Sequence, residues 1–321
     1  MQLSAIYKPV REDLVKVEKE LELVSKVNFP WLAELLGYSL KSEGKAIRPA
    51  LTLLAGKLYH YHLDNLLPMA MATELLHVAT LIHDDAIDKS PFRRSKPTVY
   101  KVWGEDKAVL LGDYLFAKAG EFTTVTQNIR VVKLFTQTLR VIATGELAQI
   151  FDAYNLEQTY QQYIQRISNK TAALFILAVE SGAVLSEAPE ASIKILNEYG
   201  YNLGIAFQIV DDILDFIGTT KEVGKPIGSD LAQGTLTLPS MLLLERYPEE
   251  NPVKRLFQNR DRQEEIKLAI EQVRNSSIID ECYTVASDYC DRACRSLNLL
   301  PDNIGRQSLI EIAGYIIRRK K

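Results

Sequence analysis

The sequence has few of the features that are typical of secreted proteins, membrane-spanning proteins or proteins stabilised by a zinc site. It has three cysteines in 321 residues, and their odd number and spacing fit neither a disulfide framework nor a zinc site. No run of about 18 uninterrupted apolar residues occurs. Residues 1–19 are too polar and charged for a signal peptide. We therefore predict a soluble, cytoplasmic protein without a membrane span.

The charge balance gives no sign of a polyanionic partner. Lys and Arg total 38 against 41 Asp and Glu, a formal net charge of −3. No basic stripe with interleaved aromatic residues is present, which argues against binding to nucleic acid. A hydrophobic content of 47% is typical of a globular chain, and the length is sufficient for a large core.

Strand-like alternation is nearly absent, whereas helical periodicity runs through almost the whole chain. The periodicity predicts helices over Ile6–Val24, Trp31–Leu40, Pro49–Tyr59, Leu67–Ile87, Ala108–Asn128, Ile129–Ala153, Glu157–Val184, Ala191–Ile217, Leu236–Glu245, Arg262–Val273, Ile278–Ser296 and Ile304–Arg318. The helices that end at Ile87 and Ile217 are apolar on all sides, so we expect them inside the bundle. No linker divides the chain, and we predict one all-α domain over residues 1–321.

One acidic phrase occurs twice, each time at the end of a long apolar helix, at residues 84–88 and 211–215. The first and last carboxylates of each phrase lie one helical turn apart on one face. Because neither phrase contains Lys or Arg and like charges at this spacing repel, each calls for a cation. Oxygen ligands suit Mg²⁺, which usually completes its shell with water and substrate phosphates. The repeat therefore predicts diphosphate chemistry at the end of the helical bundle where loops follow these two helices.

With their neighbours, these phrases resemble the motifs of the trans-isoprenyl diphosphate synthases, the head-to-tail prenyltransferases. The likeness covers nearly the whole chain, and its parts occur in the family's order: Gly44–Pro49, Leu81–Asp88, Arg93–Thr98, Gly112-Asp113, Lys170-Thr171, Phe207–Asp215 and Gly224–Pro226. The resemblance implies a helical bundle of the isoprenoid synthase type with a central active-site cavity. It also implies that an allylic diphosphate ionises and its carbocation adds to isopentenyl diphosphate.

The resemblance assigns the acidic residues to metal binding. Asp84, Asp88 and Asp211 would ligate Mg²⁺, with three ions present when substrate is bound and Mn²⁺ as a substitute. The remaining carboxylates of the two phrases would ligate the metal or support the residues that do: Asp85, Asp212 and Asp215. Since the leaving group carries most of the developing charge, these ions and the neighbouring cations would carry the catalysis.

The resemblance sorts the basic and polar residues into two diphosphate sites. The metal-free site for isopentenyl diphosphate would contain Lys45, Arg48, His77 and Arg94. The allylic site would contain Arg93, Lys170, Thr171, Gln208 and Lys225, with Lys170 and Lys225 counted among the catalytic residues. Arginine suits both sites because it can grip phosphate oxygens with two donors.

Two positions depart from the family's pattern. Ser95 stands where Gly often follows the Arg-Arg pair, and Thr235 stands where a Lys of the allylic site is usual. The basic run Arg318–Lys321 resembles tails that close over the substrate. The family also implies a homodimer, and a lipid product that can bring the enzyme to a membrane surface.

The residues just before Asp84 predict a long product. Thr80 and Ala79 lie about 6–7.5 Å below the metals on the same helix, where short-chain members have an aromatic floor. Leu76, one turn further down, is not aromatic either. We expect a product longer than C15, with C30 or above favoured over C20. Phe122 or Phe135 on a neighbouring helix would then form a deeper stop.

Two other functions fit part of the pattern. A class I terpene cyclase shares the first motif but normally lacks both a second copy and the cations for isopentenyl diphosphate. A catalytic-type subunit that needs a partner would keep both motifs, as this chain does. Incubation with Mg²⁺, isopentenyl diphosphate and allylic primers separates these alternatives.

Overall fold

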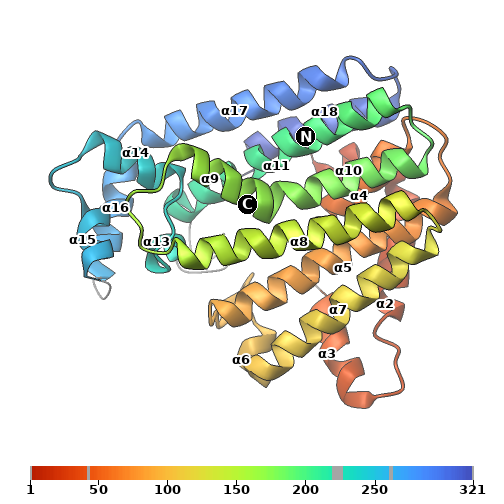
Figure 1. Ribbon diagram of the computed structural model, residues 1–321, viewed down its shortest axis with the longest axis horizontal. Coiled ribbons are helices and arrows are strands. Elements are labelled where there is room, and N and C mark those ends of the chain that lie inside the picture. The colour runs from red at the N-terminus through yellow and green to blue at the C-terminus, as the bar shows by residue number, and fades with distance from the viewer. Residues whose placement is uncertain (1, 42–43, 219–226, 260–262, 320–321) are drawn as a thin grey trace.

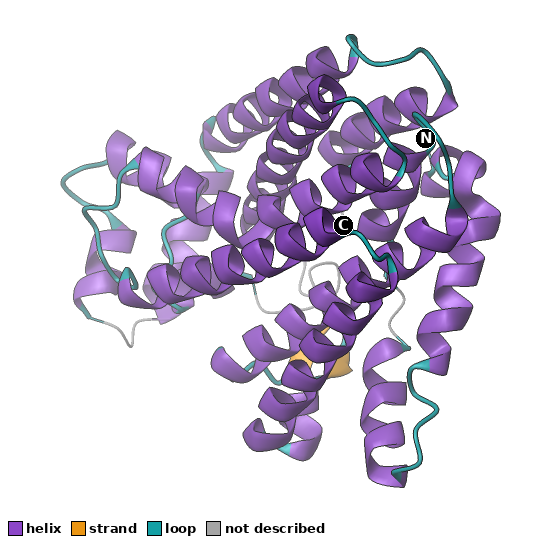
Figure 2. Ribbon diagram, turned by 45° about the vertical axis from the view of Figure 1, so that its right-hand side comes forward, coloured by secondary structure: helices purple, strands orange, loops and turns teal. Residues whose placement is uncertain are grey.

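The computed structural model describes residues 2–41, 44–218, 227–259 and 263–319. It is an all-α bundle, which confirms the predicted fold class (Figures 1 and 2). The longer helices are α2 (Arg11–Leu23), α3 (Pro30–Leu40), α4 (Ile47–Gly56), α5 (Leu63–Ile87), α7 (Glu105–Val125), α8 (Ile129–Phe151), α10 (Ala173–Leu185), α11 (Glu190–Ile217), α16 (Gln263–Arg274), α17 (Ile278–Leu297) and α18 (Ile304–Arg318). Shorter helices connect them: α1 (Leu3–Ile6), η1 (Lys8–Val10), α6 (Val99–Trp103), α9 (Tyr160–Ile167), α13 (Ser229–Ala232), α14 (Leu238–Arg246) and α15 (Pro252–Gln258).

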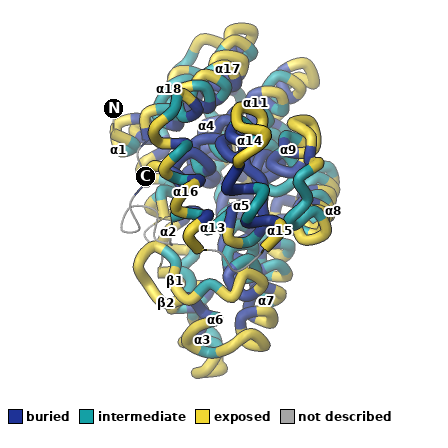
Figure 3. The backbone as a smooth tube through the Cα atoms, turned by 90° about the vertical axis from the view of Figure 1, so that its left-hand side faces the viewer, coloured by how far each residue is buried: buried dark blue, intermediate teal, exposed yellow. Residues whose placement is uncertain are grey.

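The core lies around α4, α5, α10 and α11, which pack against one another in the middle of the bundle (Figure 3). Every residue of α4 is buried. Helix α5 is long and apolar enough to cross a membrane, but 67% of its most apolar window is buried inside the protein. Its hydrophobic surface is therefore covered by neighbouring helices, as expected for the central helix of a bundle.

Two local features differ from the sequence prediction. The single helix expected over Glu157–Val184 is broken by a π-helical turn at Ser168–Ala172 between α9 and α10. A two-stranded hairpin, β1 (Phe92–Arg93) and β2 (Lys96–Pro97), stands in the loop after the first acidic phrase. Both features lie beside the cavity described below. Neither is visible to a periodicity search, because each involves only four or five residues.

Candidate active site

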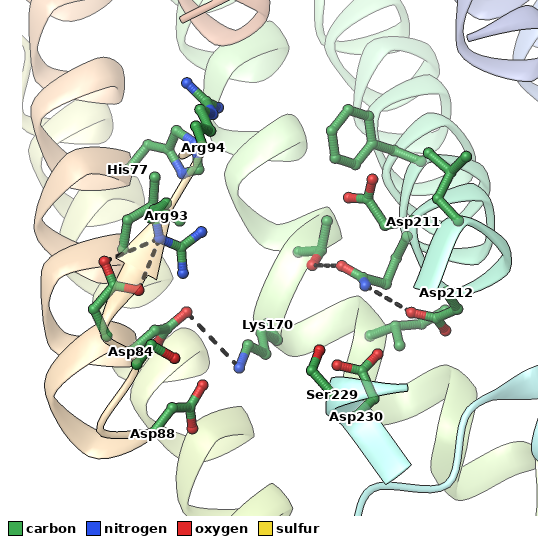
Figure 4. A pocket seen from close by; sticks show the side chains of 18 of the residues that line it. His77, Asp84, Asp88, Arg93, Arg94, Lys170, Asp211, Asp212, Ser229 and Asp230 are labelled. Atoms are coloured by element: carbon green, nitrogen blue, oxygen red, sulfur yellow. Dashed lines mark hydrogen bonds and ion pairs between the residues drawn. The ribbon is translucent and has the colours of Figure 1, made fainter. Parts of the chain in front are cut away.

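A cavity of about 570 Å³ lies between the C-terminal parts of α5 and α11, and both acidic phrases line it. Figure 4 shows Asp84 and Asp88 on one side, Asp211 and Asp212 on the other, and Lys170 between them. The two long apolar helices thus deliver the two phrases to one cavity. The sequence-based expectation that the phrases face each other is consistent with this geometry.

The first phrase contains one buried carboxylate, Asp85. Arg93 Nε donates to its two oxygens at 2.8 and 3.0 Å. Burial raises the pKa of Asp85 to about 6 although Arg93 opposes the shift. Asp84 lies nearer the cavity centre, with its Oδ2 3.9 Å from Lys170 Nζ. Asp88 is exposed at the end of the helix.

The second phrase has two buried carboxylates, Asp212 and Asp215, and one that is partly exposed, Asp211. Asp212 Oδ2 accepts from the Tyr163 hydroxyl at 2.7 Å, and Asp215 Oδ1 accepts from Ser229 Oγ at 3.0 Å. Burial, followed by the nearby Asp230 charge, raises the pKa of Asp212. By contrast, the side chain of Asp211 is 41% exposed.

Lys170 is placed by the π-helical turn. Its Nζ lies 2.9 Å from Glu146 Oε2 on α8. Two glycines allow the helices on either side to approach this turn: a Cβ at Gly145 of α8 would lie 2.9 Å from Asn169 Cβ, and a Cβ at Gly204 of α11 would lie 2.4 Å from Ala172 Cα. Such wide turns are frequent at functional sites, and here the turn directs a Lys into the cavity.

Thr171 and Gln208 form a hydrogen-bonded chain that ends on the second acidic phrase. Thr171 Oγ1 donates to Gln208 Oε1 at 2.5 Å, and Gln208 Nε2 donates to Asp212 Oδ1 at 2.8 Å. Both side chains were predicted to bind the allylic diphosphate directly. In this structure they line the cavity but bond to each other and to Asp212.

The residues predicted to bind isopentenyl diphosphate line the same cavity: Lys45, Arg48, His77 and Arg94. Arg48 is buried against the rings of Phe175 and Phe207, and its Nε has no hydrogen-bond partner. Burial lowers the pKa of Arg48 to about 10, so it remains a cation near neutral pH. Burial and the neighbouring arginines lower the pKa of His77 well below 6.5, so His77 is neutral. A buried guanidinium with an unpaired donor is suited to a metal-free diphosphate.

The hairpin beside the cavity places its turn residues in a left-handed conformation. Arg94 has φ +50° and Ser95 has φ +63°. This region is unfavourable for residues with a Cβ, which explains why Gly is common at the second position. Ser95 therefore adopts the conformation that the turn requires, but its backbone is strained there.

The residues predicted to form the chain-length pocket do not line the described cavity, which α5 lines in this part with Glu74, His77, Val78 and Leu81. Leu76 and Ala79 are fully buried in the core, and Thr80 is half-buried with its hydroxyl bonded to the His77 carbonyl oxygen at 2.8 Å. No aromatic side chain occupies these three positions.

The two candidate deep stops differ in their surroundings. Phe135 on α8 is 2% exposed, and a Cβ at Gly120 of α7 would lie 3.7 Å from its ring. Phe122 is half-buried next to the Lys118 ammonium, 5.1 Å from the ring centroid. Phe135 is therefore the better placed of the two for a stop between helices.

The side chains in the cavity suit a hard divalent ion whose coordination shell is completed by the substrate. The side chains that face the cavity from both acidic phrases offer oxygen atoms, which Mg²⁺ prefers. Among the residues that the structure describes, no three carboxylate, imidazole or thiolate side chains gather closely enough to hold an ion alone. Water and the phosphate oxygens of the substrate would therefore have to complete the coordination of an ion held by these carboxylates, as is usual for Mg²⁺ sites with few protein ligands.

Sequence reasoning missed several residues of this site, among them Glu74, Glu146, Tyr163 and, in its specific contact, Arg319. Arg319 is buried, stacks on Phe207 with 3.7 Å between guanidinium carbon and ring centroid, and donates to Asp211 Oδ1 at 2.6 Å. The basic tail was the only sequence signal for it. Thr235 lines the cavity at the position where a Lys was expected. The predicted allylic residue Lys225 lies outside the described residues.

Comparison with known proteins agrees with the motif-based resemblance. The polyprenyl synthetase family model matches residues 29–273. Heptaprenyl diphosphate synthase component 2 of Bacillus subtilis is 37% identical over 320 residues, covering 100% of this chain and 92% of that protein.

Solved structures extend the likeness to the whole fold. A polyprenyl synthase from Caulobacter crescentus, complexed with calcium and isoprenyl diphosphate, superposes with a TM-score of 0.95 at 32% identity, covering 100% of this chain and 98% of that one. A decaprenyl diphosphate synthase from Rhodobacter capsulatus gives a TM-score of 0.92 at 34% identity and full coverage of both chains. Motifs, fold and relatives agree, and this chain belongs to the polyprenyl synthetase family.

Proposed function

We propose that this enzyme is an Mg²⁺-dependent synthase that joins isopentenyl diphosphate to an allylic diphosphate and makes a long trans-polyprenyl diphosphate. The observation that carries the proposal is that one cavity holds two acidic phrases on facing helices and also the basic residues Lys45, Arg48 and Arg94, of which Arg48 is buried. A cyclase would need only the first phrase and would have no use for the second diphosphate site.

Each group in the cavity has a chemical role in this reaction. Divalent ions held by Asp84, Asp88 and Asp211 would supply Lewis-acid neutralisation of the departing diphosphate. Lys170 donates to the same diphosphate as its C–O bond breaks. Arg48 and neutral His77 hold isopentenyl diphosphate so that its double bond receives the allylic carbocation. The released diphosphate takes the proton, which accounts for the lack of a dedicated protein base in this proposal.

We infer that the product is C30 or longer. Thr80, Ala79 and Leu76 leave the face below Asp84 without an aromatic floor, and Phe135 lies 11 residues before Glu146 on α8, about 16 Å further down the helix. The names of the heptaprenyl and decaprenyl relatives support a product in this range.

We further propose a cytoplasmic homodimer assembled through α7 and α8, whose outer faces carry large exposed apolar side chains: Leu110, Val125, Ile129, Leu147 and Phe151. Several large apolar side chains exposed along two neighbouring helices favour an interface between subunits. The alternative is that a different second subunit covers these faces, since one relative is named component 2 of a heptaprenyl diphosphate synthase. Sedimentation of the purified chain distinguishes a dimer from a monomer.

The test of the function uses the purified chain alone with Mg²⁺, isopentenyl diphosphate and allylic primers of increasing length. We expect long prenyl diphosphates, identified by mass spectrometry, and no turnover after chelation. Hydrocarbon products would instead indicate a cyclase. If the chain alone were inactive but became active with a second subunit, the homodimer proposal would be wrong.

A further inference from the structure

Glu146 is a carboxylate in direct contact with the catalytic machinery that the roles above leave unused. It projects from α8, and its side chain is only 20% exposed. Its Oε2 lies 2.9 Å from Lys170 Nζ, whereas Asp84 Oδ2 lies 3.9 Å from the same nitrogen. Gln149 Oε1, one turn further along α8, lies 3.5 Å from it. The ammonium is thus shared unequally between two carboxylates.

The inequality matters for Asp84. An ammonium in hydrogen-bonding contact with a carboxylate neutralises it and occupies its lone pairs, and a divalent ion must then displace the ammonium to bind. The close contact with Glu146 holds Lys170 about 1 Å short of such a bond with Asp84. Both side chains are largely enclosed, so solvent screens the pair less than it would a surface pair.

We propose that Glu146 is a positioning residue that restrains Lys170 beside the first acidic phrase and prevents it from closing on Asp84. This keeps Asp84 available to a divalent ion and Lys170 available to the allylic diphosphate. The inference rests on the proposed function, because it assigns Asp84 to metal binding. It differs from a direct ligand role, in which Glu146 itself would hold the ion.

The two roles predict different double-mutant behaviour. In Glu146→Gln, Lys170 loses its closer carboxylate and moves onto Asp84, so the divalent ion should bind about tenfold more weakly. In a Lys170→Gln background no ammonium competes for Asp84, so the same substitution at Glu146 should have little effect. If Glu146 were a direct ligand, or acted only through its charge, Glu146→Gln would weaken binding of the ion equally in both backgrounds.

The measurement is Mn²⁺ binding, followed by the paramagnetic resonance signal of the free ion, with a non-ionisable allylic thiolodiphosphate present. It compares the full chain, Glu146→Gln, Lys170→Gln and the double variant. Glu121→Gln is the matched control, because it removes the same charge from the exposed pair in which Lys118 Nζ lies 2.9 Å from Glu121 Oε1. Thermal unfolding verifies that each variant folds.

We expect Mn²⁺ binding to be about tenfold weaker in Glu146→Gln than in the full chain. The double variant should bind within twofold of Lys170→Gln, and Glu121→Gln within twofold of the full chain. Equal weakening with and without Lys170, or no weakening at all, would overturn the inference. Because no turnover is needed, these results are independent of whether the wild-type chain makes prenyl diphosphates. Failure of the proposed function would appear separately, as wild-type chain that folds but neither binds Mn²⁺ nor forms product.

Discussion

Gly145→Ala is the sharpest test of how the π-helical turn presents Lys170. The added Cβ would lie 2.9 Å from Asn169 Cβ and 3.2 Å from the Lys170 backbone nitrogen. Unstrained carbon atoms prefer about 3.5–4.0 Å, so α8 and the turn must separate by about 0.6–1.1 Å. Both near neighbours belong to the backbone or to Cβ, which leaves no flexible side chain to rotate away.

The separation should affect catalysis more than stability. Overpacking costs about 1–3 kcal/mol, and replacing Gly by Ala within a helix returns up to about 1 kcal/mol. The free energy of unfolding should therefore fall by about 0–3 kcal/mol. A displacement of about 1 Å at a positioned group can lower the rate by about 100-fold. We expect kcat to fall about 10- to 100-fold, with KM for isopentenyl diphosphate little changed because Arg48 lies on α4.

Steady-state kinetics with a fixed allylic primer and chemical denaturation give the two quantities. Gly120→Ala on the adjacent α7 is the matched control, since the nearest atom to its Cβ would lie at an ordinary 3.7 Å. This variant should be as active as the wild type and equally or slightly more stable. A folded Gly145→Ala enzyme with kcat within twofold of the wild type would refute the role given to the turn.

Three further predictions address the hairpin, the product and the pH dependence. Ser95→Gly should raise the free energy of unfolding by up to about 1 kcal/mol, measured in urea, since Gly removes the left-handed strain; a clear loss would contradict the strained turn. Thr80→Phe should shorten the product toward C15 and Phe135→Ala should lengthen it, measured by mass spectrometry; unchanged lengths would rule out a pocket along α5 and α8. His77 is held neutral in the fold while the unfolded chain takes up a proton below pH 6.5, so its contribution to stability is complete above pH 6.5 and falls by at most about 2 kcal/mol by pH 5. His77→Asn should lose this part of the acid destabilisation, and an identical pH slope of stability in both proteins would count against it.

The parts of the site that the sequence predicts are those fixed within one helix. The spacing of Asp84 and Asp88 sets their common face, and helical periodicity places both acidic phrases at the ends of long buried helices. His77 lies two turns before Asp84 for the same reason. These relations depend on local geometry, so a single chain is enough to recognise them.

The partners of those residues could not be predicted in the same way. Tyr163 donates to a carboxylate 49 positions later, and Arg319 reaches one 108 positions earlier. Such contacts depend on how helices pack and on short irregular segments such as the π-helical turn. Glu146 carried no signal at all, because an acidic residue on a predicted amphipathic helix is ordinarily a solvated one.

The described partners of the acidic residues form a pattern that bears on metal binding. Asp85, Asp212 and Asp215 are buried and accept hydrogen bonds from the side chains of Arg93, Tyr163 and Ser229. Asp84 and Asp211 are instead partly exposed, and each meets a cation: Lys170, which lies closer to Glu146, and Arg319, which follows the last helix. Like charges brought together on two helix ends need compensation before any ion arrives. A protein cation beside a carboxylate that faces the cavity gives that compensation, and a divalent ion that enters the cavity can take its place. Burial therefore distinguishes the carboxylates that support the site, Asp85, Asp212 and Asp215, from those that can exchange a protein cation for a metal, Asp84 and Asp211.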